Sequence, residues 1–153
     1  VTTAYAGIFP AHAPVPTEEA LSADWARVLV TPASTVFVAS GAYGMVGSVV
    51  ARPDAQEAGA GEIARLHVRP DLWRQGLGRR LLHAGLNDLS AAGFRRAGLW
   101  VLELNERARA FYERLGWELD PERVLHWTHL GLTEVRYTLE LAPPVSIARP
   151  YTG

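Results

Sequence analysis

Apolar residues recur at intervals of three and four in three stretches of the chain, as they do along one face of an amphipathic helix. The first stretch begins after Thr17, a typical N-cap residue. The second follows Gly76 and ends at Gly93, where a glycine commonly terminates a helix. The third begins after Asn105, which can also cap a helix, and extends over residues 106–115. The apolar face of the first helix is predicted to consist of Leu21, Trp25, Val28 and Leu29.

Five shorter runs, either alternating or continuously apolar, predict β-strands. The first two flank the turn 41–44 and are predicted to form a hairpin. Residues 1–16 and 118–132 carry no such pattern and are predicted to be loops. The order helix, hairpin, strand, helix, strand, helix, strand indicates an α/β (α+β) fold, in which one mixed sheet carries helices on its faces. The predicted strands are residues 35–40, 45–52, 62–68, 97–104 and 133–141.

The composition narrows the classes of function. The 153 residues suffice for one domain, predicted to span residues 1–153 with residues 142–153 as a C-terminal tail. A net charge of −1 argues against nucleic-acid binding, and no apolar run is long enough to span a membrane. The absence of cysteine excludes disulfides, a thiol nucleophile and Cys-ligated metal, and agrees with a cytoplasmic protein. Basic side chains nevertheless cluster locally, at Arg74, Arg79, Arg80, Arg95 and Arg96.

One segment, VRPDLWRQGLGRRLL from Val68 to Leu82, combines a strand end with two glycines at a helix start. Glycine destabilises a helix, so the presence of Gly76 and Gly78 at this helix start requires an explanation. The first amides of a helix have no intrahelical partners and carry partial positive charge, so they bind phosphate where no side chain covers them. The dinucleotide-binding and P-loop motifs do not fit, because a third glycine and a G-K-[ST] sequence are absent. The segment predicts a pyrophosphate site, with a ligand-free helix entry as the alternative.

The same segment resembles motif A of the GNAT superfamily of N-acetyltransferases, [QR]-x-x-G-x-[GA], with Trp73 where Gln or Arg is usual. The segment LNERARAFYERLGW, residues 104–117, resembles the second signature of that family. The motifs follow in the family's order, one helix and one strand apart, and the resemblance covers residues 35–141. Residues 4–10, AYAGIFP, resemble a segment that follows the family's first helix. This implies that the first strand and part of the first helix precede Val1.

The resemblance implies a mostly antiparallel mixed sheet whose two central parallel strands splay apart, and acetyl-CoA as the co-substrate. In this family the pantetheine arm pairs with the strand that corresponds to 62–68, and the pyrophosphate lies on the turn amides. Asn105 would contact the pantetheine arm in addition to capping its helix. The cofactor-binding residues that the resemblance implies are Leu66, His67, Val68, Arg74, Gln75, Gly76, Leu77, Gly78, Arg79 and Asn105.

The candidate catalytic residues indicate direct transfer. With no cysteine and no serine-nucleophile motif, we expect the amine to attack the bound thioester directly, in a ternary complex. Tyr112 resembles the family's general acid, since a phenol is protonated at neutral pH and can donate to a leaving thiolate. Glu62 is predicted as the general base, because some members carry a catalytic glutamate at the start of this strand. Proton loss through water is the alternative, and Glu103 and His67 are weaker candidates for the base.

The predicted function is therefore acetyl transfer to a primary amine of a small molecule or peptide, with no metal, nucleic acid or membrane as partner. A CoA-binding sensor or interaction module without catalysis is the alternative, and a nucleic-acid-binding domain built on the arginine cluster is a third hypothesis. His126 and His129 do not make a metal site without a third ligand. Trp25 and Trp127 could border the acceptor pocket. Many relatives dimerise, so a homodimer is left open.

Overall fold

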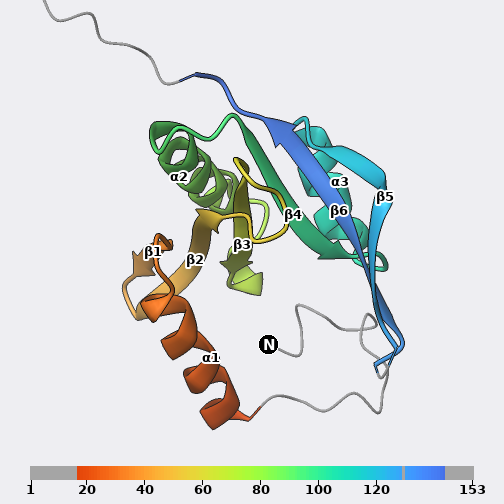
Figure 1. Ribbon diagram of the computed structural model, residues 1–153. Helices are drawn as coiled ribbons and strands as arrows, with labels where there is room; N and C mark the ends of the chain where they lie inside the picture. Colours follow the sequence, from red (N-terminus) through yellow and green to blue (C-terminus); the bar gives the residue numbers. More distant parts are fainter. Residues whose placement is uncertain (1–16, 129, 144–153) are drawn as a thin grey trace, which may run out of the picture.

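The chain folds around one mixed β-sheet, which confirms the predicted α/β class. The computed structural model describes residues 17–128 and 130–143. The helices there are α1 (Glu18–Val30), α2 (Leu77–Ala91) and α3 (Glu106–Arg114), with a 3-10 turn at Pro70–Leu72. The strands are β1 (Thr35–Gly41), β2 (Gly44–Pro53), β3 (Gly61–Val68), β4 (Arg96–Leu102), β5 (Glu118–Trp127) and β6 (Leu132–Glu140). They lie in the order β1-β2-β3-β4-β6-β5, and every neighbouring pair is antiparallel except β3 with β4 (Figure 1).

The helices begin and end at the residues that local signals predicted. The Thr17 hydroxyl accepts a hydrogen bond from the amide of Ala20 at 3.1 Å. The Asn105 side chain accepts one from Ala108 at 3.2 Å, so both predicted N-caps are confirmed. Gly93, which follows α2, has a φ of 99°, a conformation that glycine adopts easily. No helix in the described part of the chain is long and apolar enough to cross a membrane.

The main core lies between one face of the sheet and helices α2 and α3. Gly85 of α2 lies so close to the sheet that a Cβ there would stand 3.0 Å from Ile63 and 3.6 Å from Ala51. A Cβ on Gly78, at the start of α2, would stand 3.6 Å from Phe111 of α3, so the two helices also meet each other. The buried cluster includes Val49, Ile63, Leu81, Leu82, Leu89, Leu99, Tyr112, Trp117 and Tyr137.

Helix α1 lies against the opposite face of the sheet. Arg65 pairs with Val50, the neighbour of Ala51 on β2, and Ala51 faces α2. Because successive strand residues point to opposite faces, Arg65 and Val50 face away from α2. There the Arg65 guanidinium lies 5.2 Å from the ring centre of Trp25 in α1. The predicted burial of Leu29 is wrong, since this side chain is 67% exposed: α1 presents only a narrow face to the sheet.

Residues 118–132 were predicted to be a loop, and this prediction is wrong because β5 occupies most of the segment. Pro121 interrupts the apolar pattern, and the pairing of β5 with β6 shifts register between Asp120 and Val124. Proline lacks the amide that a ladder needs, and it is tolerated here because β5 is the edge strand of the sheet. The exposed side chains of an edge strand therefore concealed its extended structure.

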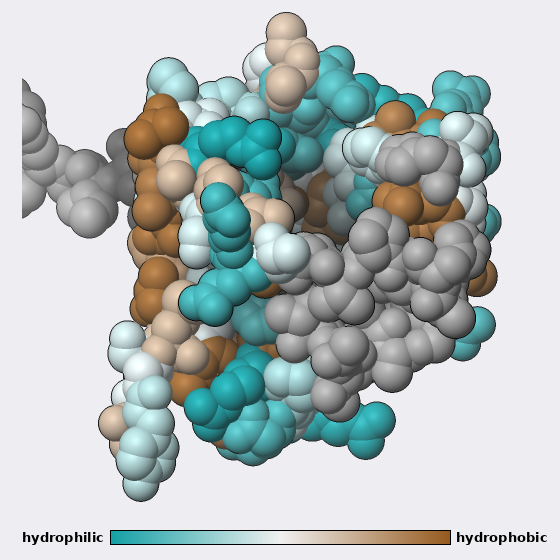
Figure 2. Space-filling model, turned by 90° about the horizontal axis from the view of Figure 1, so that it is seen from below, coloured by the Kyte–Doolittle hydropathy of each residue, from teal (hydrophilic) through white to brown (hydrophobic). Residues whose placement is uncertain are grey.

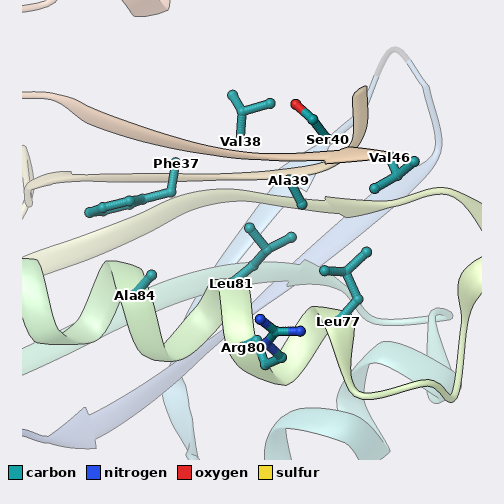
Figure 3. A pocket seen from close by; sticks show the side chains of 9 residues that line it. All are labelled: Phe37, Val38, Ala39, Ser40, Val46, Leu77, Arg80, Leu81 and Ala84. Atoms are coloured by element: carbon teal, nitrogen blue, oxygen red, sulfur yellow. The ribbon is translucent and has the colours of Figure 1, made fainter. Parts of the chain in front are cut away.

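Strand β1 forms the other edge of the sheet and carries apolar surface. Hydrophobic surface gathers along the left margin of Figure 2, the side on which Figure 1 shows β1. Val38 of β1 and Met45 at the start of β2 are 53% and 55% exposed. On the inner side, Phe37 lies on the side of β1 that faces α2 and lines a pocket of about 430 Å³, which Leu81 and Arg80 of α2 also line (Figure 3). This pocket is separated by β2 from the parallel strand pair.

The parallel strands β3 and β4 leave each other after two residue pairs. Their pairing is confined to Gly61 with Ala97 and Glu62 with Gly98, although both strands are fully described and continue beyond these residues. Strand β3 also has a bulge at Ala64, which has no partner on β2. Bulges bend a strand and re-aim its side chains, so this one contributes to the separation. The splayed central pair agrees with the fold that the resemblance implied.

Candidate active site

A cleft of about 680 Å³ opens where β3 and β4 separate. Its walls come from both strands, from α1, from α3 and from β5 and β6. Along the gap the two strands do not pair with each other, so a bound molecule can satisfy their backbone groups. The lining residues that matter below are Trp25, Arg65, Leu66, His67, Trp100, Asn105, Tyr112, Trp127 and Glu134.

The glycine turn between β3 and α2 has the backbone that an anion site requires. Gly76 has a φ of 81° and Arg74 a φ of 62°, both in the left-handed region that favours glycine. Gly76 is the N-cap of α2 and offers no side chain to the first amides of the helix. A Cβ on Gly76 would meet no described atom within 4 Å. The amides at the start of α2 are therefore accessible to a phosphate group.

Trp73 ties this turn to its surroundings. Its indole Nε1 donates a hydrogen bond to the carbonyl of Val68 at 2.9 Å, across the base of the turn. The guanidinium of Arg107, in the first turn of α3, lies 3.4 Å from the centre of the Trp73 ring. The residue that departs from the usual motif thus links the glycine turn both to the end of β3 and to α3.

The predicted cofactor-binding residues lie in two adjoining places. Leu66, His67 and Asn105 line the cleft. Val68 ends β3, and the remaining residues form the turn and the first residues of α2. The side chain of Leu77 lines the pocket between β1 and α2, so a ligand at the turn would meet its backbone (Figure 3). The turn residues are Arg74, Gln75, Gly76, Leu77, Gly78 and Arg79.

Helix α3 brings Tyr112 to the cleft. Tyr112 is 9% exposed and lines the cleft wall. Its ring makes edge contacts with Phe111, at 5.2 Å between ring centres, and with Trp117, at 5.9 Å. These contacts hold the ring in one orientation, which is what a proton donor aimed at a fixed atom needs.

The position of α3 is fixed by a polar network around Tyr137 of β6. The Tyr137 hydroxyl donates to Glu113 and accepts a hydrogen bond of 3.1 Å from Arg109, both of α3. Burial raises the pKa of Tyr137, so the phenol stays protonated and can make both bonds. The network lies next to Tyr112 in the sequence and limits the movement of its helix.

Glu62 lies at the closed end of the strand pair, outside the cleft lining. The residue is 8% exposed, and its carboxylate accepts a hydrogen bond of 2.8 Å from Arg52. A second guanidinium, that of Arg136, lies 3.9 Å away. Four residues of extended strand separate Glu62 from Leu66, about 13 Å along β3. The side chain predicted as the base is thus held among arginines and is not among the lining residues of the cleft, which begin at Ile63 on this strand.

The sequence interpretation did not single out Trp100 of β4 or Glu134 of β6 as site residues, and both line the cleft. Trp25 and Trp127, predicted to border an acceptor pocket, do line the cleft. His67 also lines it; although the residue as a whole is exposed, partial burial of its imidazole lowers the pKa.

Nothing in the described ranges assembles a metal site. No group of three His, Cys, Asp or Glu side chains lies close enough together there to hold an ion. The ring Nδ1 of His126 lies 3.3 Å from the Thr133 hydroxyl, and His129 is outside the described residues. The chemical groups that the described part of the cleft offers include backbone amides and the phenol of Tyr112.

A splayed parallel strand pair, a glycine turn at a helix N-terminus and a cleft between them match the fold and site that the resemblance implied, and comparison with known proteins agrees. The model of the acetyltransferase (GNAT) family matches residues 2–117, more than half of the chain. The chain belongs to the GNAT acetyltransferase family.

Individual relatives are more distant. Over 62 residues the chain is 47% identical to mycothiol acetyltransferase of Streptomyces avermitilis, a match that covers 40% of this chain. The chain spans about a fifth (20%) of the length of that relative. The ribosomal-protein-S18-alanine N-acetyltransferase of Escherichia coli has a similar fold, with a TM-score of 0.64, 21% identity and coverage of 96% of this chain and 92% of that one. An N-acetyltransferase of Thermoplasma acidophilum, solved in complex with coenzyme A, gives a TM-score of 0.68 at 16% identity, covering 91% and 84% of the two chains.

Proposed function

We propose that this protein transfers an acetyl group from acetyl-CoA to a primary amine of a small molecule or peptide. The proposal rests on one observation, namely that three features of the site adjoin one another. The open amides of the glycine turn follow directly from β3, β3 borders the cleft, and Tyr112 lines the same cleft. A pyrophosphate on residues 74–79 would direct the pantetheine arm along the unpaired edge of β3. Asn105 lines the cleft across from β3 and would contact that arm.

The chemistry requires an attacking amine and a protonated leaving group. The amine nitrogen forms the C–N bond to the acetyl carbonyl carbon, the C–S bond breaks, and Tyr112 donates its proton to the departing thiolate. The proton released by the amine passes to a group in the cleft, and Tyr112 is later reprotonated from solvent. General acid catalysis of this kind contributes about 10²- to 10⁴-fold in rate.

For the proton acceptor we propose His67 or a water molecule beside it in place of Glu62. His67 lines the cleft, and its lowered pKa keeps the imidazole neutral at neutral pH. Glu62 is engaged by Arg52 and lies at the closed end of the strand pair. Its role is then to hold the ends of β3 and β4 together.

Replacing His67 with glutamine should remove the acidic limb of the pH profile of kcat/KM. Burial lowers the pKa of His67 below 6.5, so at neutral pH the imidazole is neutral and can accept a proton. The imidazole becomes protonated and loses this capacity as the pH falls through the lowered pKa. The profile is measured in both proteins between about pH 5 and pH 8. An unchanged acidic limb in H67Q would remove His67 from the reaction and leave the proton to water.

The proposed function is tested first by calorimetric titration with acetyl-CoA, with ATP and NAD as controls. In wild-type protein we expect saturable binding of acetyl-CoA alone. G78E should weaken it at least about ten-fold, because a carboxylate at the helix N-terminus repels the pyrophosphate. A Cβ at Gly78 makes only ordinary contacts of 3.6 Å, and G78Q, an uncharged side chain of similar size, separates the effect of the charge from that of the added bulk.

Turnover is then followed by the release of CoA thiol, a clean signal because the chain contains no cysteine. Failure of wild-type protein to bind acetyl-CoA would contradict the proposal. Binding without turnover across a broad panel of amines would support the alternative, a CoA-binding module.

A further inference from the structure

Three of the chain's five tryptophans line the cleft on the face opposite α2 and α3. Trp25 comes from α1, Trp100 from β4 and Trp127 from β5. Trp100 pairs across the sheet with Arg136, whose guanidinium lies 5.2 Å from its ring, while its neighbours on β4 face the core. The glycine turn leads into α2 on the core face. An acceptor entering beside the tryptophans would therefore approach the gap between the strands from the other side.

The remainder of this wall is apolar. Four aliphatic side chains from α1, β2 and the β5–β6 hairpin complete it. Burial of apolar surface is worth about 25 cal/mol per Å², so such a wall favours an acceptor with a hydrophobic or aromatic body. The four side chains are Leu21, Met45, Leu130 and Leu132.

The charges around the cleft leave one carboxylate available. Arg65 lines the cleft as a cation, but Asp24 of α1 forms an ion pair with it. Glu134 also lines the cleft, and its Oε2 accepts a hydrogen bond of 2.9 Å from the Trp127 indole nitrogen. Glu134 makes no ion pair with a residue in the described ranges. Asp24 also forms an ion pair with the exposed Arg27, so Glu134 is the cleft-lining carboxylate that has no cationic partner among the described residues.

We infer that this end of the cleft binds an acceptor with one ammonium group on an apolar or aromatic body, with Glu134 holding the ammonium and the indoles enclosing the body. The inference rests on the proposed function and names the substrate class of that site. A carboxylate bonded to an indole keeps its second oxygen for a charge-assisted hydrogen bond, and the indole faces attract cations. Polyamines and aminoglycosides fit poorly, because their further charges would meet Arg65 and apolar walls.

The test measures binding separately from turnover. The probe is 2-phenylethylammonium, titrated into the full chain with saturating CoA, and tryptophan fluorescence reports occupancy because the indoles line the site. We expect saturable binding that E134Q weakens about ten-fold, the usual size of a lost charge-assisted hydrogen bond. The control is E140Q on the same strand, whose carboxylate is 81% exposed and is not among the lining residues, and it should bind like wild type. Spermidine at equal concentration should bind more weakly than the probe.

Each result separates the two claims. Absence of saturable probe binding, equal binding in E134Q and wild type, or tighter binding of spermidine would overturn the acceptor class even if acetyl-CoA binds normally. Loss of acetyl-CoA binding in wild-type protein would instead contradict the proposed function. In turnover, the inference requires that E134Q raise KM for 2-phenylethylamine, because Glu134 holds the ammonium form, and this nitrogen must lose its proton before it attacks the thioester.

Discussion

Replacing Tyr112 with phenylalanine is expected to lower kcat at least about 100-fold, while the affinity for acetyl-CoA stays within about two-fold of wild type. The substitution removes one oxygen and keeps the ring, so the edge contacts with Phe111 and Trp117 persist. What disappears is the proton for the departing thiolate, which must then leave as an anion or take its proton from water. Steady-state kinetics and calorimetric titration with acetyl-CoA measure the two quantities separately.

The Tyr112 prediction needs a control for the loss of any phenol. Tyr43 is 95% exposed in the β1–β2 turn and is not among the residues that line the cleft, so Y43F should match wild type in both measurements. If Y112F retained wild-type kcat, Tyr112 would be a packing residue of α3 and not the acid. If both kcat and cofactor affinity fell together, the hydroxyl would serve binding.

The parts of the site that sequence could predict are those encoded locally. The glycine turn, the cap at Asn105 and the position of Tyr112 two turns further on all lie within short segments whose residue types dictate their conformation. A positive φ at Gly76 and an amide-bonding side chain at Asn105 follow from covalent geometry and hydrogen bonding over a few residues. The glycine turn and the start of α3 could therefore be predicted from short segments of the sequence.

Apart from Trp25 and Trp127, the residues at the proposed acceptor end could not be predicted, because strand pairing brings them together. Glu134 is a candidate because it accepts a hydrogen bond from Trp127 of β5. The exposed residues of β5 gave no pattern that predicted a strand. Glu62 is a second example. Its position at a strand start predicted a base, and no local pattern indicated that Arg52 and Arg136 would reach it from other strands. Sequence patterns report the period of an element and contain little about its partners across the sheet.

A buried ion pair supports the point at which β3 and β4 begin to separate. Arg136 of β6 is fully buried and forms a hydrogen-bonded ion pair with Asp54, 82 residues away in the sequence. Its guanidinium lies against Gly98 of β4, in the space that a Cβ would occupy. Gly98 itself pairs with Glu62, so glycine, guanidinium and carboxylates together form the closed end of the cleft.

Replacing Gly98 with alanine should therefore lower the free energy of unfolding by about 3 kcal/mol or more, the usual cost of disrupting a buried ion pair. The added methyl group would overlap the guanidinium, which cannot move away without leaving Asp54 as an uncompensated buried charge. Urea unfolding measures the change, with G78A as the matched control. At Gly78 a Cβ has ordinary contacts within a helix, so alanine there should be neutral or stabilising.

The cause of the Gly98 effect can be isolated by removing the guanidinium. R136M is itself expected to be destabilising, because it leaves Asp54 buried without its partner. In that background the space beside Gly98 is no longer filled by a charged group, so adding G98A should cost less than about 1 kcal/mol. Equal costs in both backgrounds would show that alanine disturbs β4 by another route. A reduced cost would establish that the close approach of Arg136 requires glycine at the residue where β3 and β4 separate.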